Sequence, residues 1–225
     1  MKICEQLHIV KGITAVIGSG GKTTLLRILA EELSGTVILT TSTHILPFAG
    51  IPMLVTDDIE QVRRALALHR VICMGTPAAE GKLTTPALPF SVLADAADYV
   101  IVEADGSKRL PLKFPNNTEP VLLPEIRHIF VVAGLSGLYR PAEQVCHRWA
   151  LARERLPKLP ENMDEAAVAE LLWAGYGSYH PQFILNQADT PALRQAGEHI
   201  AALLQERGAE AVYILSLKEM GLHYV

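Results

Sequence analysis

The sequence predicts an α/β protein with a three-layer, mostly parallel sheet. Short apolar runs alternate with longer stretches of helical periodicity along most of the chain, which is the pattern of strands separated by helices. A glycine-rich turn joins the first apolar run to the first helical stretch. In addition, 49% of the 225 residues are hydrophobic, a share that supports a core and excludes both a disordered chain and a disulfide-stapled miniprotein.

The first half of the chain is expected to contain four buried strands with helices between them. Strands are predicted where apolar residues run together, over residues 13–17, 36–41, 71–74 and 99–103. Helices are predicted where apolar residues recur at helical spacing, over residues 23–33, from an N-cap at Asp57 to about residue 69, and over residues 91–97. Residues 75–89 are rich in Gly, Pro and Thr, so a loop or a short hairpin is expected there.

The second half is expected to return to the same sheet after a helical insertion. Four prolines exclude a regular helix from residues 109–124. Strands are predicted over residues 129–132, 182–185 and 211–215, and a helix over residues 192–207. Residues 141–180 contain two helical patterns and no comparable strand. We therefore expect one domain over residues 1–225, with residues 141–180 as a helical insertion or lid.

Charge and cysteine content exclude several classes of function. No apolar stretch approaches the roughly 20 residues of a transmembrane helix, and the N-terminus has no signal-peptide core. The net charge of -4 gives no basic field for nucleic acid. Three scattered cysteines without a C-x-x-C pair suggest buried thiols. We expect a cytoplasmic protein without nucleic-acid or membrane partners.

The turn after the first strand has the composition of a phosphate-binding loop. Glycines let backbone N–H groups converge on a phosphate, Lys22 adds a full positive charge, and the hydroxyl of Thr23 is suited to a bound magnesium ion. The usual G-x-x-x-x-G-K-[ST] pattern would need glycine at Val16. The shorter form here resembles the G-T-N-G-K-T-T loop of Mur ligases. The predicted nucleotide-binding residues are Gly18, Ser19, Gly20, Gly21, Lys22, Thr23 and Thr24.

An acidic sequence follows the apolar run at residues 99–103 and offers the carboxylates that a magnesium–nucleotide site requires. Ligands gather at the carboxyl ends of parallel strands, so Glu103 is predicted to bind the metal together with Thr23. Asp105 is predicted to orient the attacking water, and Gly106 would let the backbone approach a γ-phosphate. A solvated acidic turn is the alternative interpretation.

A candidate base-recognition sequence follows the apolar run at residues 183–185. Asn186 and Asp189 match the N-K-x-D pattern of GTPases, in which the Asp carboxylate accepts hydrogen bonds from guanine and the Asn braces the loop. Gln187 stands where that pattern has Lys; it keeps the stem and loses the charge. Asn and Asp are also ordinary turn residues, and Asp189 precedes a helix start. The pattern favours GTP over ATP and leaves ATP open.

The order of these motifs resembles that of metallochaperone GTPases, and the details are more similar to the selenium-dependent hydroxylase accessory family (YqeC type). The resemblance is carried by E-A-D-G-S-K-R-L-P-L-K-F-P from Glu103, by Glu119-Pro120, and by the segments at residues 145–148 and 185–189. It covers nearly the whole chain, and its most specific part is the first of these stretches. The position of Gln187 is commonly Lys in the family pattern, so this chain departs there.

The resemblance implies a magnesium-dependent P-loop nucleoside triphosphatase that helps to mature selenium-dependent molybdenum hydroxylases. Those enzymes, or the proteins that handle their cofactor, would be its partners. In this interpretation Lys22, Glu103 and Asp105 are the catalytic residues. Further candidates for contacting substrate or sensing the γ-phosphate are Thr41, Thr43, Lys108, Lys113, His147 and Arg148.

Two other classes of function remain open. A small-molecule kinase or Mur-like ligase would use the same phosphate loop with an acceptor other than water, under a lid formed by residues 141–180. A nucleotide-sensing module would bind nucleotide with little turnover.

Overall fold

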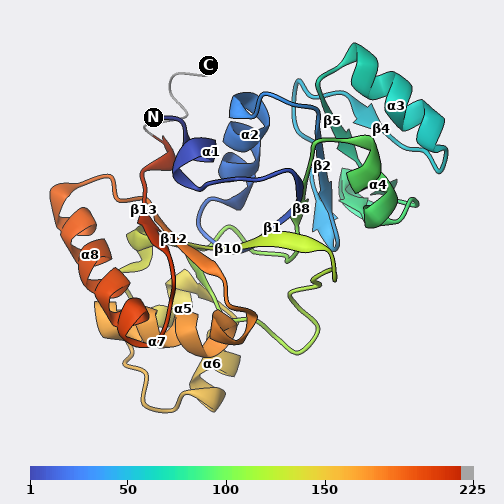
Figure 1. Cartoon of the computed structure of the whole chain (residues 1–225). Coiled ribbons are helices and arrows are strands. Elements are labelled where there is room, and N and C mark those ends of the chain that lie inside the picture. The colour runs from blue at the N-terminus through green and yellow to red at the C-terminus, as the bar shows by residue number, and fades with distance from the viewer. Residues whose placement is uncertain (219–225) are drawn as a thin grey trace. The chain divides into compact units, whose positions relative to one another are not determined.

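The computed structural model describes residues 1–218 and confirms the predicted three-layer α/β class (Figure 1). The main sheet has eight strands, in the order β13 (Val212–Ile214), β12 (Gln182–Asn186), β10 (Ile126–Gly134), β1 (Gly12–Gly18), β8 (Tyr99–Glu103), β2 (Val37–Thr41), β5 (Val71–Met74) and β4 (Met53–Leu54). The four neighbouring pairs from β1 to β4 are parallel, and so are the two pairs from β10 to β13.

The chain divides into two compact units, and the boundary between them passes through β1 and β10. The first unit comprises Met1–Val16, Leu25–Gly106 and Val121–His128. The second comprises Ile17–Thr24, Ser107–Pro120 and the chain from Ile129 onward. A single domain over residues 1–225 stays a prediction.

The first unit is built on β1, β8, β2, β5 and β4. The register sets Val16 of β1 opposite Glu103 at the carboxyl end of β8. Both central strands, β8 and β2, are apolar and buried, which is why sequence reasoning located them closely. The helices of this unit are α1 (Ile3–Gln6), α2 (Lys22–Glu32), whose first residues belong to the second unit, α3 (Ile59–Leu68) and α4 (Phe90–Ala96).

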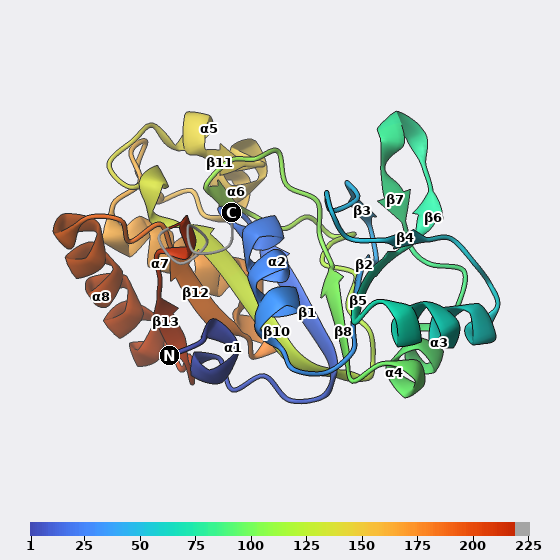
Figure 2. The same cartoon turned by 90° about the horizontal axis from the view of Figure 1, so that it is seen from above.

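The segment predicted as a loop or short hairpin is a hairpin. Its strands, β6 (Thr76–Pro77) and β7 (Leu83–Thr84), pair antiparallel on either side of the 3-10 turn η1 (Ala79–Gly81), as Figure 2 shows. Strand β3 (His44–Ile45) pairs with β7 and completes a small second sheet.

The second unit contains β10, β12 and β13 with the helices that follow β10. Among these, α7 (Glu165–Tyr176) and α8 (Pro191–Glu206) pack against each other (Figure 1). Residues 141–180, expected to be a helical insertion, contain α7 together with α5 (Ala142–Val145), α6 (Trp149–Arg155) and η3 (Gly177–Tyr179). The 3-10 turn η2 (Leu135–Gly137) precedes this region. A two-residue strand within it, β11 (Cys146–His147), pairs parallel with β9 (Leu112–Lys113) and was not predicted.

Most predicted boundaries shift by one residue or less, and two corrections have a clear physical reason. Strand β10 begins at Ile126 rather than at residue 129, because its partly exposed first residues give a weak apolar signal. The N-cap of α3 is Asp58 rather than Asp57: its carboxylate accepts a 2.8 Å hydrogen bond from the backbone N–H of Glu60. Within residues 1–218 no helix is both long and apolar enough to cross a membrane.

The cap assignment makes a testable distinction between two adjacent aspartates. Asp58→Ala should lower the free energy of unfolding by about 1 kcal/mol, because it leaves a backbone N–H of the first turn of α3 without its acceptor. The exposed neighbour provides a matched control, and Asp57→Ala should change stability little. Urea unfolding of both variants measures the difference; a larger loss for Asp57→Ala would contradict the cap.

Candidate functional site

The glycine-rich turn after β1 adopts backbone conformations that favour glycine. Gly18, Gly20 and Gly21 have φ angles of +89°, +86° and +138°. A Cβ atom on Gly18 would collide with the backbone of Val132, and one on Gly20 would lie 2.5 Å from the backbone nitrogen of Gly134. The loop is therefore packed directly against the carboxyl end of β10, where a side chain would not fit.

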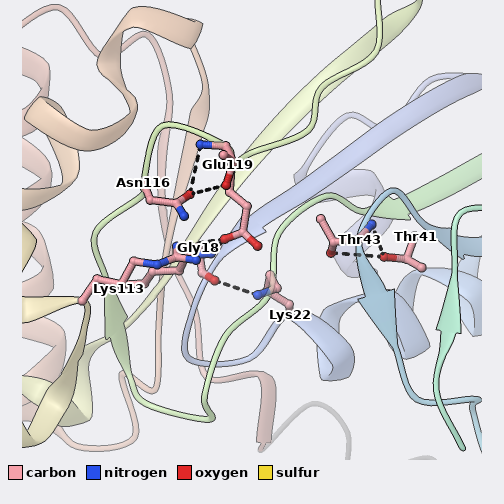
Figure 3. Close-up of polar contacts among 9 residues, drawn as sticks. Gly18, Lys22, Thr41, Thr43, Lys113, Asn116 and Glu119 are labelled. Carbon is pink, nitrogen blue, oxygen red and sulfur yellow. Dashed lines mark hydrogen bonds and ion pairs between the residues drawn. The ribbon is translucent and has the colours of Figure 1, made fainter. Parts of the chain in front are cut away.

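The lysine of this loop is buried and turned back onto it. Lys22 is 3% exposed, and its Nζ donates a 2.7 Å hydrogen bond to the carbonyl oxygen of Gly18 (Figure 3). Thr23 and Thr24 follow in the first turn of α2, and both are exposed. A positive charge is thus held within the loop, while the threonine expected to bind magnesium is accessible.

Ser19 anchors the loop rather than facing solvent. Its backbone N–H donates to the carbonyl oxygen of Val132 at 2.8 Å, and its hydroxyl donates to the carbonyl oxygen of Leu110. Like the Lys22 ammonium group, the Ser19 hydroxyl therefore has a partner within the protein.

Asn186 connects the predicted base-recognition segment to the glycine loop. Its Nδ2 donates to the carbonyl oxygen of Gly20 at 2.7 Å, and its Oδ1 accepts from the backbone N–H of Leu217 at 3.0 Å. The register of β10 and β12 places Asn186 opposite Gly134, at the level that the loop contacts. One side chain thus joins three segments that are far apart in sequence.

Two other residues of this segment each accept a hydrogen bond from a serine hydroxyl. Asp189 is exposed, and its Oδ1 accepts a 2.5 Å hydrogen bond from the hydroxyl of Ser216. Gln187 has a φ of +67°, and its Oε1 accepts from the hydroxyl of Ser136 at 2.6 Å. The Gln187 amide is therefore hydrogen-bonded to Ser136. The Gln187 side chain could lie along a nucleotide base only if this hydrogen bond were broken.

The acidic strand end lies in the first unit and is buried. Glu103 is 7% exposed and Asp105 is fully buried. Thr41, at the end of the neighbouring strand, donates its hydroxyl to the carbonyl oxygen of Glu103 at 2.8 Å. The Thr41 oxygen also accepts from the backbone N–H of Thr43 at 3.0 Å (Figure 3). The two candidate switch threonines are therefore linked to each other and to the strand that carries Glu103.

Several of the remaining candidates meet in a cluster of charged side chains in the second unit. Lys113 has a fully buried side chain, and its Nζ lies 2.9 Å from Oε2 of Glu119 (Figure 3). Arg148 places Nη1 2.8 Å from the same oxygen. Pairing of β9 with β11 brings the two basic segments together, because His147 lies opposite Lys113 in that register.

The positive charges of this cluster lower the pKa values of Glu119 and His147. Burial alone would raise the pKa of Glu119, but hydrogen bonds and charges from Lys113 and Arg148 outweigh it and lower that pKa from 4.5 to about 2. Burial lowers the pKa of His147, and the positive charges of Arg148, Lys113 and Lys108 lower it further. At neutral pH Glu119 is therefore ionised, and His147 lies in an environment that disfavours its charged form.

Sequence reasoning found the cations of this cluster and missed their anion. Glu119 stood out only as part of a family motif, because nothing in its own neighbourhood of Asn and Pro residues marks it as a site. The contact depends on two strands of two residues each, which carry no periodic signal. Among residues 1–218, no three His, Cys, Asp or Glu side chains gather as a metal site.

The low pKa of Glu119 predicts a pH-dependent contribution to stability. A carboxylate whose folded pKa is depressed stabilises the fold above its unfolded pKa, and this stabilisation is lost as the pH falls towards about 2. Glu119→Gln should lower the free energy of unfolding at pH 7 by about 2 kcal/mol, a figure reduced for partial solvent screening.

The difference between wild type and Glu119→Gln should narrow as the pH is lowered from 5 towards 3, which urea unfolding at several pH values measures. Glu80→Gln is the matched control, because Glu80 also pairs with a lysine, at 2.5 Å to Lys82, but on an exposed hairpin. A difference that stayed constant from pH 7 to pH 3 would contradict the assignment.

Comparison with known proteins places the chain in a family. The model of the YqeC protein family matches residues 14–150. The protein YqeC of Escherichia coli (strain K12) is 31% identical over 148 residues, which cover 61% of this chain and 58% of that protein. The crystal structure of FlhF complexed with GMPPNP/Mg(2+) aligns with a TM-score of 0.38 and 16% identity, over 92% of this chain and 65% of that one.

These matches span less than two thirds of the length of either protein. The family model, however, covers more than half of this chain and includes the glycine loop, the acidic strand end and the charged cluster. The chain belongs to the YqeC family.

Proposed function

We propose that this chain is a magnesium-dependent nucleoside triphosphatase that prefers GTP to ATP. The observation that carries the proposal is the hydrogen bond from Asn186 to the carbonyl oxygen of Gly20. This bond connects the glycine loop between β1 and α2, which carries the buried Lys22, to the segment that ends in Asp189. A bound nucleotide needs a phosphate site and a base site in such proximity. An ordinary turn after β12 would not need a side chain directed at the glycine loop.

Each end of the nucleotide has a proposed partner in the second unit. The backbone amides of Gly18–Gly21 and the ammonium group of Lys22 would bind the phosphates, since converging N–H groups and a helix start favour anions. The Asp189 carboxylate would accept from a guanine base, and its bond to Ser216 orients it. Guanine preference follows from the acceptor-only character of an ionised carboxylate.

The metal ligands and the catalytic carboxylate are proposed from the chemistry of the available donors. The hydroxyl of Thr23 and the carboxylate of Glu103 are oxygen ligands of the kind that magnesium prefers, and Thr23 is exposed. Bound magnesium would neutralise charge on the phosphates. Asp105 would orient the attacking water, and Thr41 and Thr43 would respond to the terminal phosphate.

The biological role is proposed from the motif resemblance within the family. It is that of an accessory protein in the maturation of selenium-dependent molybdenum hydroxylases, with those enzymes or their cofactor-handling proteins as partners. A kinase or ligase is a second candidate, because the cationic cluster of Lys113 and Arg148 lies in the same unit as the glycine loop. Turnover that depends on an added acceptor would favour that second class.

Removal of the loop lysine tests the nucleotide site. Lys22→Ala should weaken GTP binding about 100-fold or more, because it removes the full positive charge of the phosphate loop; this corresponds to about 3 kcal/mol. Calorimetric titration in the presence of magnesium measures the affinity. Lys82→Ala, on the exposed hairpin of the first unit, is the control and should bind as wild type does. Unchanged affinity of a folded Lys22→Ala protein would overturn the phosphate-loop assignment.

Exchange of the base-recognition carboxylate tests the guanine preference. Asp189→Asn should weaken GTP binding by roughly 100-fold and favour xanthosine triphosphate, because the new amide can donate to the xanthine oxygen. Ser216→Ala separates base contact from orientation: it removes only the hydroxyl that bonds Asp189 and should cost less affinity. Competition binding with GTP, ATP and xanthosine triphosphate measures all three proteins. Guanine recognition would be contradicted if Asp189→Asn lost equal affinity for GTP and xanthosine triphosphate. It would also be contradicted if wild type bound ATP and GTP with equal affinity.

A further inference from the structure

Cations gather around the carboxylate of Glu119. Lys113 and Arg148 both contact it, and Lys108 is close enough for its charge to lower the pKa of His147. Three positively charged side chains therefore lie in this part of the second unit. Arginine and lysine side chains are the groups that bind oxyanions through charge-assisted hydrogen bonds.

The two cations converge on one oxygen atom. Nζ of Lys113 and Nη1 of Arg148 lie 2.9 Å and 2.8 Å from Oε2 of Glu119. An arginine that serves a carboxylate alone commonly binds both oxygens in a fork. Convergence on a single atom is the arrangement that a phosphate or carboxylate oxygen of a ligand would also find.

The backbone at Arg148 is held in a conformation that is unfavourable for its residue type. Arg148 has φ 64° and ψ 38°, in the left-handed region, at the residue that precedes α6. This conformation is strained for a residue with a Cβ atom, and such strain is concentrated at ligand sites. Here it accompanies the placement of the guanidinium group on Glu119.

The segment that carries Lys113 also contacts the glycine loop. The carbonyl oxygen of Leu110 accepts from the Ser19 hydroxyl, and that of Pro111 accepts from the backbone N–H of Gly134 at 2.8 Å. Lys113 follows two residues later in β9, and an extended chain advances about 3.3 Å per residue. The cluster is therefore about 10 Å or less along the backbone from the loop, and Figure 3 shows both in one view.

We infer that Lys113 and Arg148 bind an oxyanion of a second substrate, a phosphate or carboxylate group, next to the nucleotide. Glu119 holds the two cations until that group replaces it. The exposed parts of the site are suited to such an exchange, since the Glu119 and Arg148 side chains are 17% and 22% exposed while Lys113 is covered. The inference rests on the proposed function only in taking nucleotide as the first substrate. A purely structural ion pair is the competing explanation.

Titration of inorganic phosphate into Glu119→Gln tests this inference. The neutral amide of this variant competes less strongly than the carboxylate for the two cations, so the variant should bind phosphate at least about 10-fold more tightly than wild type. The gain should disappear in the double variant Lys113→Met/Glu119→Gln and persist in Lys22→Ala/Glu119→Gln. Glu80→Gln, which removes a lysine-paired glutamate elsewhere, should bind phosphate as wild type does.

Two results would overturn the inference. No gain in Glu119→Gln would leave a structural ion pair, and a gain abolished by Lys22→Ala but not by Lys113→Met would place the phosphate in the glycine loop. GTP titration of the same proteins separates the two proposals. If wild type binds GTP but Glu119→Gln gains no affinity for phosphate, only the second-substrate site is refuted. If Glu119→Gln gains affinity for phosphate but the protein binds no nucleotide, only the proposed nucleoside triphosphatase activity is refuted.

Wild type provides a second measurement that does not depend on the folding of Glu119→Gln. Phosphate should raise its thermal unfolding midpoint by binding the folded state, and Arg148→Ala should reduce that rise to the part contributed by the glycine loop. A rise of equal size in Arg148→Ala would also overturn the inference.

Discussion

The close packing of the glycine loop against the end of β10 is the constraint on which the rest of the second unit depends. Ser19 bonds the backbone of Val132, and a side chain on Gly20 would meet Gly134 and the carbonyl oxygen of Pro111. Asn186, opposite Gly134 on the next strand, donates its side-chain amide to the carbonyl oxygen of Gly20. The glycine loop, the segment proposed to recognise the base and the segment that leads to Lys113 therefore share one small region of backbone.

Sequence reasoning predicted the parts of this region that depend on local chemistry. Strand β8 was predicted at its observed bounds, because a fully buried parallel strand is a continuous apolar run. The glycine loop was predicted because strand, glycines, lysine and helix follow one another within a few residues. Asn186 was expected to brace a loop on the analogy of GTPases, and its bond to Gly20 has that form.

The features that were missed depend on contacts between distant segments. The pairing of β9 with β11 joins residues more than thirty positions apart through four residues, so no periodicity announces it. Without that pairing, Lys113 and Arg148 were separate candidates and Glu119 had no assigned partner. The N-cap of α3 was also missed, although it is a local feature. Two adjacent aspartates have equal propensity to cap a helix, and only the backbone geometry selects Asp58.

One physical principle connects the glycine loop with the charged cluster. In each, a buried cation is held by an oxygen of the protein: Lys22 by the carbonyl of Gly18, and Lys113 by the carboxylate of Glu119. An internal partner lowers the cost of burying the charge, but a ligand must then exceed that partner in strength. At the cluster that partner is an ionised carboxylate, so a ligand that displaces it must bring a full negative charge.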